Sequence, residues 1–196
     1  MGTTDFTIKP LDSSTWPAFV QLAEKHNGVW GGCWCTWFHE RDADPAKVRK
    51  ERLVCEGKSH AALVFDGPTA IAWCQYGRPA ELPRIYHKKA YSEAVTDQPD
   101  WRITCFFVDR DYRKRGVSKV ALEGALTLIA QAGGGLVESF PADAEGRKTS
   151  ASFLYNSTLS LFDQLGFERK KLIGKHHWLV TKRVDPSEPS TEILLE

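Results

Sequence analysis

The spacing of apolar side chains predicts short strands and amphipathic helices in the first half of the chain. Phe6-Thr7-Ile8 alternates in the manner of a half-buried strand, and four apolar side chains between Trp16 and Ala23 fall on one helix face. Asp66-Gly67 lies between two apolar runs and is a strong hairpin signal. The expected elements are a strand at 6–8, helices at 14–23 and 45–56, and hairpin strands at 61–65 and 70–75.

The second half of the chain is organised around one apolar segment. Ile103 to Val108 is nearly all apolar, which is typical of a central strand buried on both faces. Between Ser118 and Ala132, apolar and polar side chains separate onto two helix faces, and three glycines end that helix. The other expected elements are a helical turn near 85–94, a strand at 136–140, a helix capped by Ser157 that ends at Leu165, and strands at 167–172 and 177–181.

This order of elements predicts a mixed α/β or α+β fold, with one sheet layered by helices. The chain has 196 residues, of which 42% are hydrophobic, enough for one domain with a substantial core. We expect that domain to span residues 1–184. From Asp185 the chain is acidic and contains Pro186 and Pro189, so residues 185–196 are expected to form a mobile tail.

Charge and apolar content argue against several classes of partner. The formal net charge is +1, so neither nucleic acid nor an anionic membrane surface is an expected partner. No apolar stretch approaches the ~20 residues needed to cross a bilayer. The N-terminus has no basic segment followed by an apolar run, so we expect no signal peptide. The five cysteines are then expected to be free thiols in the reducing cytoplasm.

The most specific chemical signal lies between the central strand and the helix that follows it. Arg113-Lys114-Arg115-Gly116-Val117-Ser118 directly precedes that helix. A helix N-terminus carries unpaired N–H groups and a partial positive charge, and Gly116 has no Cβ to keep a phosphate away. The segment therefore predicts a pyrophosphate site, with a plain basic turn as the alternative. It lacks the Gly-Lys-Ser/Thr ending of a Walker loop and the several glycines of a dinucleotide fingerprint.

These residues resemble a known family. Arg113-x-x-Gly116-x-Ser118 resembles the Arg/Gln-x-x-Gly-x-Gly/Ala signature of the GNAT superfamily of N-acetyltransferases. The stretch from Phe107 to Tyr112 resembles the family's passage from strand to loop, and Leu165-Gly166-Phe167 resembles its Gly-Phe after the fourth main helix. The resemblance covers roughly residues 60–181.

Two positions depart from the family pattern. Ser118 replaces the usual Gly or Ala, and its hydroxyl could cap the helix or touch phosphate. Phe162 stands where many members have a Tyr that is a candidate proton donor to the departing CoA thiolate. This second departure favours an alternative function, a catalytically weak acetyl-CoA-binding sensor module.

The resemblance implies a fold and a cofactor site. The fold would be a GNAT-like central mixed sheet, largely antiparallel, with helices on both faces and a parallel strand pair, 103–108 and 136–140, that splays apart. Acetyl-CoA would bind there as co-substrate, with the pantetheine arm on strand backbone and the pyrophosphate on the basic loop. The implied binding residues are Phe106, Phe107, Val108, Arg113, Lys114, Arg115, Gly116, Val117 and Ser118.

The implied reaction is direct attack of a primary amine on the acetyl thioester. The acceptor could be a small molecule or a protein amine, and a homodimer is left open. An alkyl amine has a pKa near ~10.4, so a proton must be removed. Glu138 is the first candidate base, if burial raises its pKa; an ion pair with Lys or Arg is the equal alternative. Asp109 is second, or a cap for the loop, and His39 or Glu40 is third, because their segment commonly borders the acceptor pocket in this family.

The segment from Asn27 to His39 is unusually rich in Gly, Trp and Cys. Cys33 and Cys35 with His39 could suggest a metal site, but zinc needs four ligands and no second pair accompanies them. We expect no metal. A reactive thiol is an alternative, and the favoured interpretation is core packing or an acceptor pocket with apolar walls.

Overall fold

The structure is a computed structural model that describes residues 6–150 and 153–187. Its strands are β1 (Thr7–Pro10), β2 (His60–Asp66), β3 (Thr69–Gly77), β4 (Trp101–Val108), β5 (Gly135–Ser139), β6 (Glu168–Ile173) and β7 (His177–Val184). Its helices are α1 (Trp16–Lys25), α2 (Ala46–Cys55), α3 (Lys88–Ala94), α4 (Val117–Gln131) and α5 (Leu159–Gln164), and a 3-10 turn spans Arg110–Tyr112.

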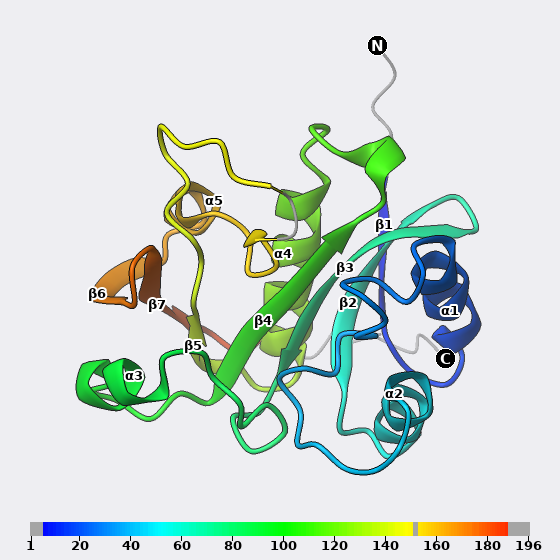
Figure 1. Ribbon diagram of the computed structural model, residues 1–196, viewed down its shortest axis with the longest axis horizontal. Helices are drawn as coiled ribbons and strands as arrows, with labels where there is room; N and C mark the ends of the chain where they lie inside the picture. The colour runs from blue at the N-terminus through cyan, green and yellow to red at the C-terminus, as the bar shows by residue number, and fades with distance from the viewer. Residues whose placement is uncertain (1–5, 151–152, 188–196) are drawn as a thin grey trace, which may run out of the picture.

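The described strands form one sheet in the order β1-β2-β3-β4-β5-β7-β6 (Figure 1). Neighbouring strands are antiparallel, apart from the parallel pair β4 and β5. Helix α4 packs on one face of the sheet through Leu122, Ala125 and Ile129. Helix α1 covers the other face, where Phe19 lies in a separate apolar cluster with Trp73 of β3. The expected fold class, a largely antiparallel mixed sheet with helices on both faces, is confirmed.

The capping residues of α4 and α5 differ from the sequence expectation. Helix α4 begins at Val117 rather than Ser118, and Gly116 is its N-cap, so the Ser118 hydroxyl does not cap it. Thr158, not Ser157, is the N-cap of α5. Ser157 has a φ of 61°, in the left-handed region, whereas Thr158 has the extended backbone that is typical of an N-cap side chain such as Ser or Thr. The expectation that Ser157 caps this helix was therefore wrong by one residue.

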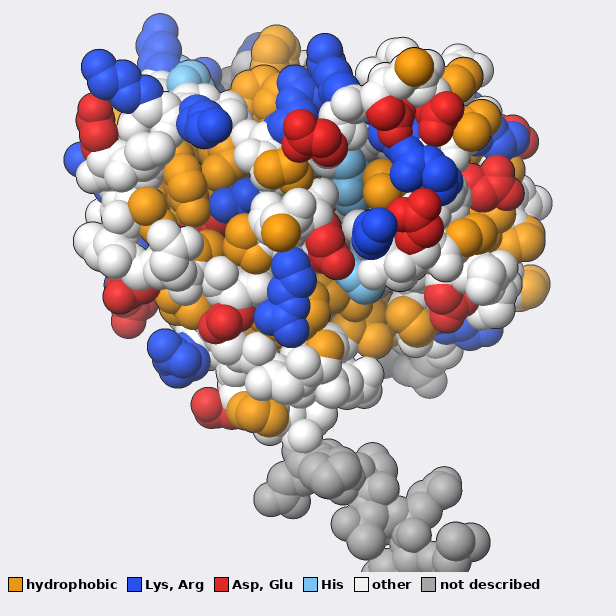
Figure 2. All heavy atoms as spheres, turned by 90° about the horizontal axis from the view of Figure 1, so that it is seen from below, with side chains coloured by type: hydrophobic (Ala, Val, Ile, Leu, Met, Phe, Trp, Pro, Cys, Tyr) orange, Lys and Arg blue, Asp and Glu red, His pale blue; other side chains and the backbone are white. Residues whose placement is uncertain are grey.

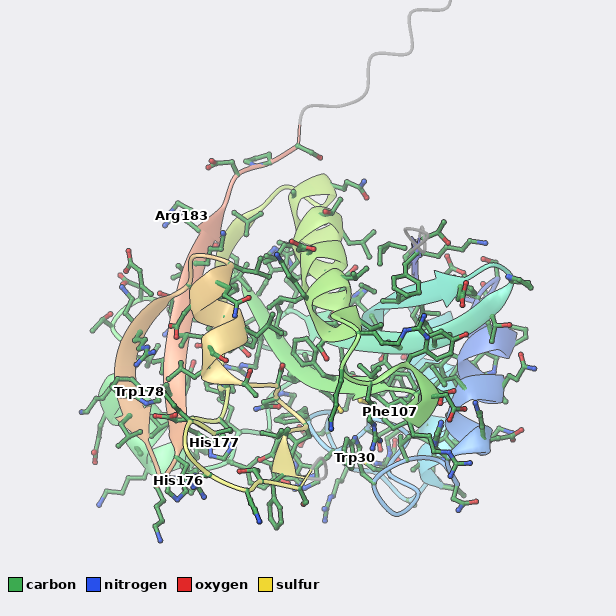
Figure 3. The ribbon with its side chains drawn as sticks, turned by 90° about the horizontal axis from the view of Figure 1, so that it is seen from above. Trp30, Phe107, His176, His177, Trp178 and Arg183 are labelled. Carbon is green, nitrogen blue, oxygen red and sulfur yellow. The ribbon has the colours of Figure 1, made fainter. Side chains whose placement is uncertain are left out.

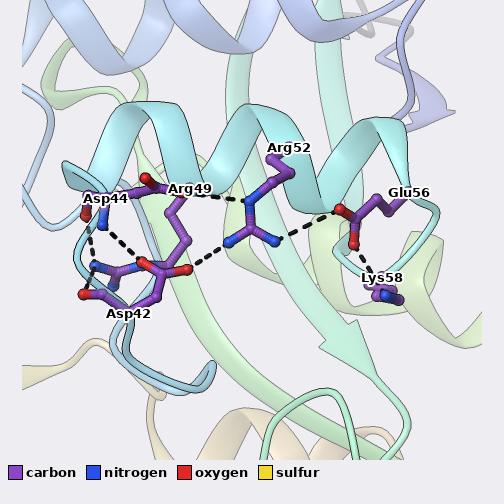
Figure 4. Close-up of polar contacts among 6 residues, drawn as sticks. All are labelled: Asp42, Asp44, Arg49, Arg52, Glu56 and Lys58. Carbon is purple, nitrogen blue, oxygen red and sulfur yellow. Dashed lines mark hydrogen bonds and ion pairs between the residues drawn. The ribbon is translucent and has the colours of Figure 1, made fainter.

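Helix α2 is polar on its outer face and is tied to the loop before it (Figure 4). Arg49 and Arg52 pair with Asp42, and Arg52 also reaches Asp44 and Glu56. Such surface pairs contribute at most about 1 kcal/mol each. On the face in Figure 2, basic and acidic side chains are interspersed, in keeping with a net charge of +1.

A β-bulge interrupts the middle of β4. Cys74 pairs with Phe106 and Tyr76 with Ile103, so Gln75 alone faces two residues of β4. The extra residue reverses which side chains point to which face: Ile103 joins the cluster under α4, but Cys105 joins the cluster under α1. This bulge turns the second half of β4 relative to the strands beside it.

The parallel strands separate immediately before the bulge. Among the described residues, β4 pairs with β5 only at Trp101 with Val137 and at Arg102 with Glu138. The Ser139 hydroxyl makes a last bridge to the Ile103 carbonyl, at 3.0 Å. Beyond it the two strands part, which is the splay that the family resemblance implied.

The structure describes the chain as far as residue 187. Most of the expected tail, residues 188–196, lies outside the described residues, so that expectation stays a prediction. Within the described ranges, no helix is long and apolar enough to cross a membrane. All five cysteines are free thiols.

Candidate functional site

A cavity of about 440 Å³ opens where β4 and β5 part. Its walls are the end of β4, the loop before α4, and the start of α5 with the segment preceding it. It brings together eight of the nine residues expected to bind a cofactor, namely Phe106, Phe107, Val108, Arg113, Lys114, Gly116, Val117 and Ser118. Arg115 is the exception, because its guanidinium lies 4.9 Å from the ring centre of Tyr112.

The loop before α4 is shaped to receive an anion. Gly116 has a φ of 77°, a left-handed conformation that favours glycine, and a Cβ built on it would meet no atom within 4 Å. The space over its backbone is therefore open. Arg113 is tied to β4 by a hydrogen bond from its Nε to the Val108 carbonyl, at 3.3 Å. Among the described residues that line this cavity, three are basic and none is acidic.

The helix that follows adds backbone donors beside this loop. Helix α4 has 15 residues, and within the described chain no side chain caps its N-terminus. The first N–H groups of the helix, at Val117 and Ser118, adjoin the cavity and carry the positive end of the helix dipole. Backbone donors, fixed cations and an open glycine together fit a pyrophosphate group.

The segment before α5 forms a wall across the splay. The Tyr155 carbonyl accepts a hydrogen bond of 2.6 Å from the Phe106 N–H. The Phe106 N–H is one of the backbone groups of β4 that we expected to pair with pantetheine. In this structure it is hydrogen-bonded to Tyr155 instead. Leu154 faces the first cavity and Tyr155 faces a second one.

The second cavity, which we call the aromatic pocket, has a volume of about 270 Å³. It is lined by six aromatic residues and three cysteines: Trp30, Trp37, Phe38, Tyr86, Phe153, Tyr155, Cys33, Cys35 and Cys105. Trp30 also lines the first cavity, where it meets Phe107 edge to face at 6.1 Å (Figure 3). The sequence indicated apolar walls from the segment around Cys33, but it gave no sign that Tyr86 and Tyr155 would join them.

Glu138 is buried and paired rather than exposed to either cavity. Its Oε1 accepts hydrogen bonds from Arg102 Nε at 2.6 Å and from the Tyr91 hydroxyl at 3.2 Å. Burial raises the pKa of Glu138, while the Arg102 guanidinium opposes that shift. The sequence left open whether Glu138 is a general base or part of an ion pair, and in the structure it forms an ion pair with Arg102.

Asp109 ties helix α1 to the end of β4. It accepts hydrogen bonds from Lys25 Nζ at 2.7 Å and from the Asp111 N–H at 3.1 Å. Burial works to raise the pKa of Asp109, but these hydrogen bonds outweigh it and the pKa is lowered. The second bond caps the 3-10 turn, as expected of a loop cap.

His39 lies in a buried polar network under α2. Its Nδ1 is 2.9 Å from the Glu81 carbonyl, and its Nε2 is 3.2 Å from the Ser59 hydroxyl. Burial and the nearby charge of Lys50 lower the pKa of His39 to about 3. An imidazole in this state is a weak proton acceptor at neutral pH. Among the described residues that line the two cavities, none is His, Asp or Glu.

Lys50 is an unusual member of the same network. Its side chain is fully buried, and its Nζ donates to Ser59 at 2.7 Å and to Gln75 at 2.6 Å. Burial lowers the pKa of Lys50, and the acidic groups that act on it are thiols rather than carboxyls. The Cys35 thiol accepts a hydrogen bond of 3.2 Å from Trp73 Nε1. Burial works against ionisation of Cys35, but its hydrogen bonds and Lys50 lower its pKa.

The sequence also contains a candidate group of metal ligands, around Cys33, and the unusual Phe162. Within residues 6–150 and 153–187, no group of three or more His, Cys, Asp and Glu side chains is arranged to hold a metal ion. Phe162 is fully buried and packs edge to face with Phe106 at 6.0 Å and with Phe167 at 4.9 Å. It therefore supplies core packing at the position where many GNAT members have a Tyr.

Solved structures match this architecture over nearly the whole chain. The ribosomal-protein-S18-alanine N-acetyltransferase of Escherichia coli has a TM-score of 0.51 at 13% identity, covering 94% of this chain and 97% of that one. A GNAT-family acetyltransferase of Streptococcus agalactiae has a TM-score of 0.51 at 11% identity, covering 93% and 98%. This chain has the GNAT acetyltransferase fold.

The GNAT fold assigned here rests on structure, not on sequence similarity. No protein-family model matches the chain, and no curated protein sequence matches it significantly. A candidate acetyltransferase of Salmonella typhimurium, whose structure is described with its cofactor acetyl-CoA, has a TM-score of 0.50 at 11% identity, covering 94% of this chain and 96% of that one. At such identities the similarity is one of fold.

Proposed function

We propose that this protein is an N-acetyltransferase that moves an acetyl group from acetyl-CoA to a primary amine. The observation that carries the proposal is the cavity at the splay of β4 and β5. It combines an open Gly116, the cations Arg113 and Lys114, and the N-terminus of α4. These features suit a pyrophosphate, and the GNAT fold associates this place with acetyl-CoA.

The binding residues have separate tasks in this proposal. Arg113, Lys114 and the N–H groups at the start of α4 would hold the pyrophosphate. The backbone of Phe107 and Val108 would align the pantetheine arm, and Trp30 and Leu154 would exclude water from it. Acetyl-CoA supplies an activated acetyl thioester. The amine nitrogen attacks the carbonyl carbon, the carbon–sulfur bond breaks, the sulfur leaves as a thiolate, and the nitrogen releases one proton to water.

The chain supports this chemistry without a conventional base in the walls. Glu138, Asp109 and His39 are engaged elsewhere, as described above. We propose that the amine binds as the free base, because the described lining of the aromatic pocket contains no carboxylate to stabilise an ammonium group. A CoA-like thiol has a pKa of about 8.5, so water can protonate the departing thiolate without a Tyr at Phe162.

The direct test is release of free thiol from acetyl-CoA in the presence of primary amines. Release that depends on the amine, with the acetylated amine identified by mass spectrometry, would support transfer. A protein that binds acetyl-CoA but transfers to no amine would instead be a sensor module. Phe162 and the absence of His, Asp and Glu from the described cavity walls favour that second candidate. The five free thiols support a reducing compartment, the cytoplasm, for either function.

A further inference from the structure

The aromatic pocket adjoins the cavity at the splay of β4 and β5, called the cofactor cavity from here on, so closely that the two share their dividing wall. Trp30 lines both cavities. On β4, Cys105 faces the aromatic pocket while its neighbour Phe106 faces the cofactor cavity. On the segment that crosses the splay, Tyr155 faces the aromatic pocket and Leu154 faces the cofactor cavity. A molecule in the aromatic pocket is therefore one residue layer away from the cofactor cavity.

Two aromatic rings form a flat, stacked part of the wall of the aromatic pocket. Trp37 and Tyr86 are stacked with ring centres 3.7 Å apart and an interplanar angle of 7°. The Arg84 guanidinium lies 4.3 Å from the Trp37 ring centre and donates to the Trp37 carbonyl at 2.9 Å, which fixes that ring. Tyr155 adds a third ring, 5.5 Å from Tyr86. Fixed aromatic surfaces of this kind favour a planar apolar ligand.

The electrostatics of the aromatic pocket exclude a polycation. None of the described lining residues is Asp or Glu, so a second or third ammonium group would have no counter-charge. Two cations act on the walls of the aromatic pocket, Arg84 at the Trp37 ring and Lys50 near the Cys33 thiol. The volume of about 270 Å³ also sets a limit, since a cavity of about 150 Å³ accommodates benzene. One ring system with a short chain fills the available space.

We propose that the acceptor is a primary alkylamine attached to one flat, apolar ring system, and that the aromatic pocket binds the ring. This inference rests on the proposed acetyl transfer and names its substrate class. The ring would lie against Tyr86 and Tyr155, with the amine directed past Trp30 toward the cofactor cavity. Polyamines, aminoglycosides and lysine-containing peptides fall outside the class.

Calorimetric binding separates this inference from the activity on which it rests. Tryptamine and phenethylamine are the probes, with spermidine and kanamycin as polycationic comparators. Binding of the ring amines to the protein without acetyl-CoA, at least tenfold tighter than the comparators, is the expected result. Equal or tighter binding of spermidine or kanamycin would overturn the substrate class. Acetylation of those polycations alone would overturn it too, while leaving acetyl transfer itself intact.

A variant of Tyr86 ties the binding to this pocket. Tyr86 is 41% exposed, so Tyr86→Ala should fold while losing one wall of the stack. We expect tryptamine binding to weaken at least tenfold in this variant, with acetyl-CoA binding unchanged. Leu172→Ala is the matched control, because Leu172 is 46% exposed and lines neither cavity in the described structure. Unchanged tryptamine affinity in Tyr86→Ala would show that the ring binds elsewhere and would overturn the proposal.

Discussion

Arg102 Nε donates a hydrogen bond of 2.6 Å to Glu138 Oε1, and the two side chains are only 4% and 1% exposed. The same two residues form the last backbone-paired position between β4 and β5. The buried ion pair therefore joins the parallel strands directly before they part. It fixes the closed end of the splay from which the cofactor cavity opens.

Replacing one partner of this pair should destabilise the fold rather than stop the chemistry. Glu138→Gln leaves the Arg102 guanidinium buried without its counter-charge, which typically costs about 3–5 kcal/mol. For a chain of this length, that corresponds to a loss of roughly 6 °C or more in melting temperature. Turnover measured well below the melting point should stay within about tenfold, since loss of a general base costs 10²–10⁴-fold.

An exposed ion pair of the same length is the control. Glu168 accepts from Lys170 at 2.6 Å, but its side chain is 75% exposed. Glu168→Gln should shift the melting temperature little, since exposed pairs contribute at most about 1 kcal/mol. If Glu138→Gln lost turnover by a hundredfold or more without a change in melting temperature, Glu138 would be the general base and this prediction would be wrong.

Acetyl-CoA should stabilise the protein through the loop before α4. At a ligand concentration about 100 times the dissociation constant, the stabilisation is about 2.7 kcal/mol. Gly116→Asp should abolish the thermal shift, because it adds bulk and negative charge in the open space over the backbone. Gly146→Asp is the matched control, since Gly146 has a φ of 66° and equally open surroundings outside the cofactor cavity. If neither variant changes the acetyl-CoA shift, the anion site lies elsewhere.

The sequence predicted the parts of the structure that depend on local patterns. The strands, the helices and the anion-binding loop follow from periodicity, glycine placement and charge between residues 6 and 184. The bulge that opens β4 could not be predicted, because it is defined by register, with Gln75 facing two residues of β4. The roles of Glu138 and Tyr155 also depend on partners distant in sequence, Arg102 and Phe106 respectively.

Lys50 should make stability depend on pH in a predictable direction. Burial lowers its pKa, so the folded protein binds fewer protons than the unfolded chain as the pH approaches the ordinary value of 10.5. Stability should therefore rise with pH in the native protein, by at most about 1.4 kcal/mol per pH unit from this group. In Lys50→Met this contribution disappears.

Urea unfolding at pH 7.5 and 9.5 measures the free energy of unfolding of the native protein and of Lys50→Met. The native protein should gain stability relative to Lys50→Met as the pH rises, and titrating groups that do not interact with Lys50 cancel in the difference. Lys58→Met, at a side chain that is 61% exposed, should track the native protein at both values. Parallel pH dependence of the native protein and Lys50→Met would mean that Lys50 titrates normally in the fold.

The pH profile of amine transfer tests whether any protein group acts as the base. If the amine binds as the free base, kcat/KM for the amine should rise about tenfold per unit between pH 7 and 9, because the amine pKa lies near ~10.4. A protein base would instead give a plateau above its own pKa.

Cys35 is the critical alternative to free-base binding, since it lines the aromatic pocket and its pKa is lowered. We expect Cys35→Ser to keep the rising profile, with the KM for acetyl-CoA unchanged across the range. A plateau in the native protein that is lost in Cys35→Ser would assign the proton to that thiolate and contradict free-base binding.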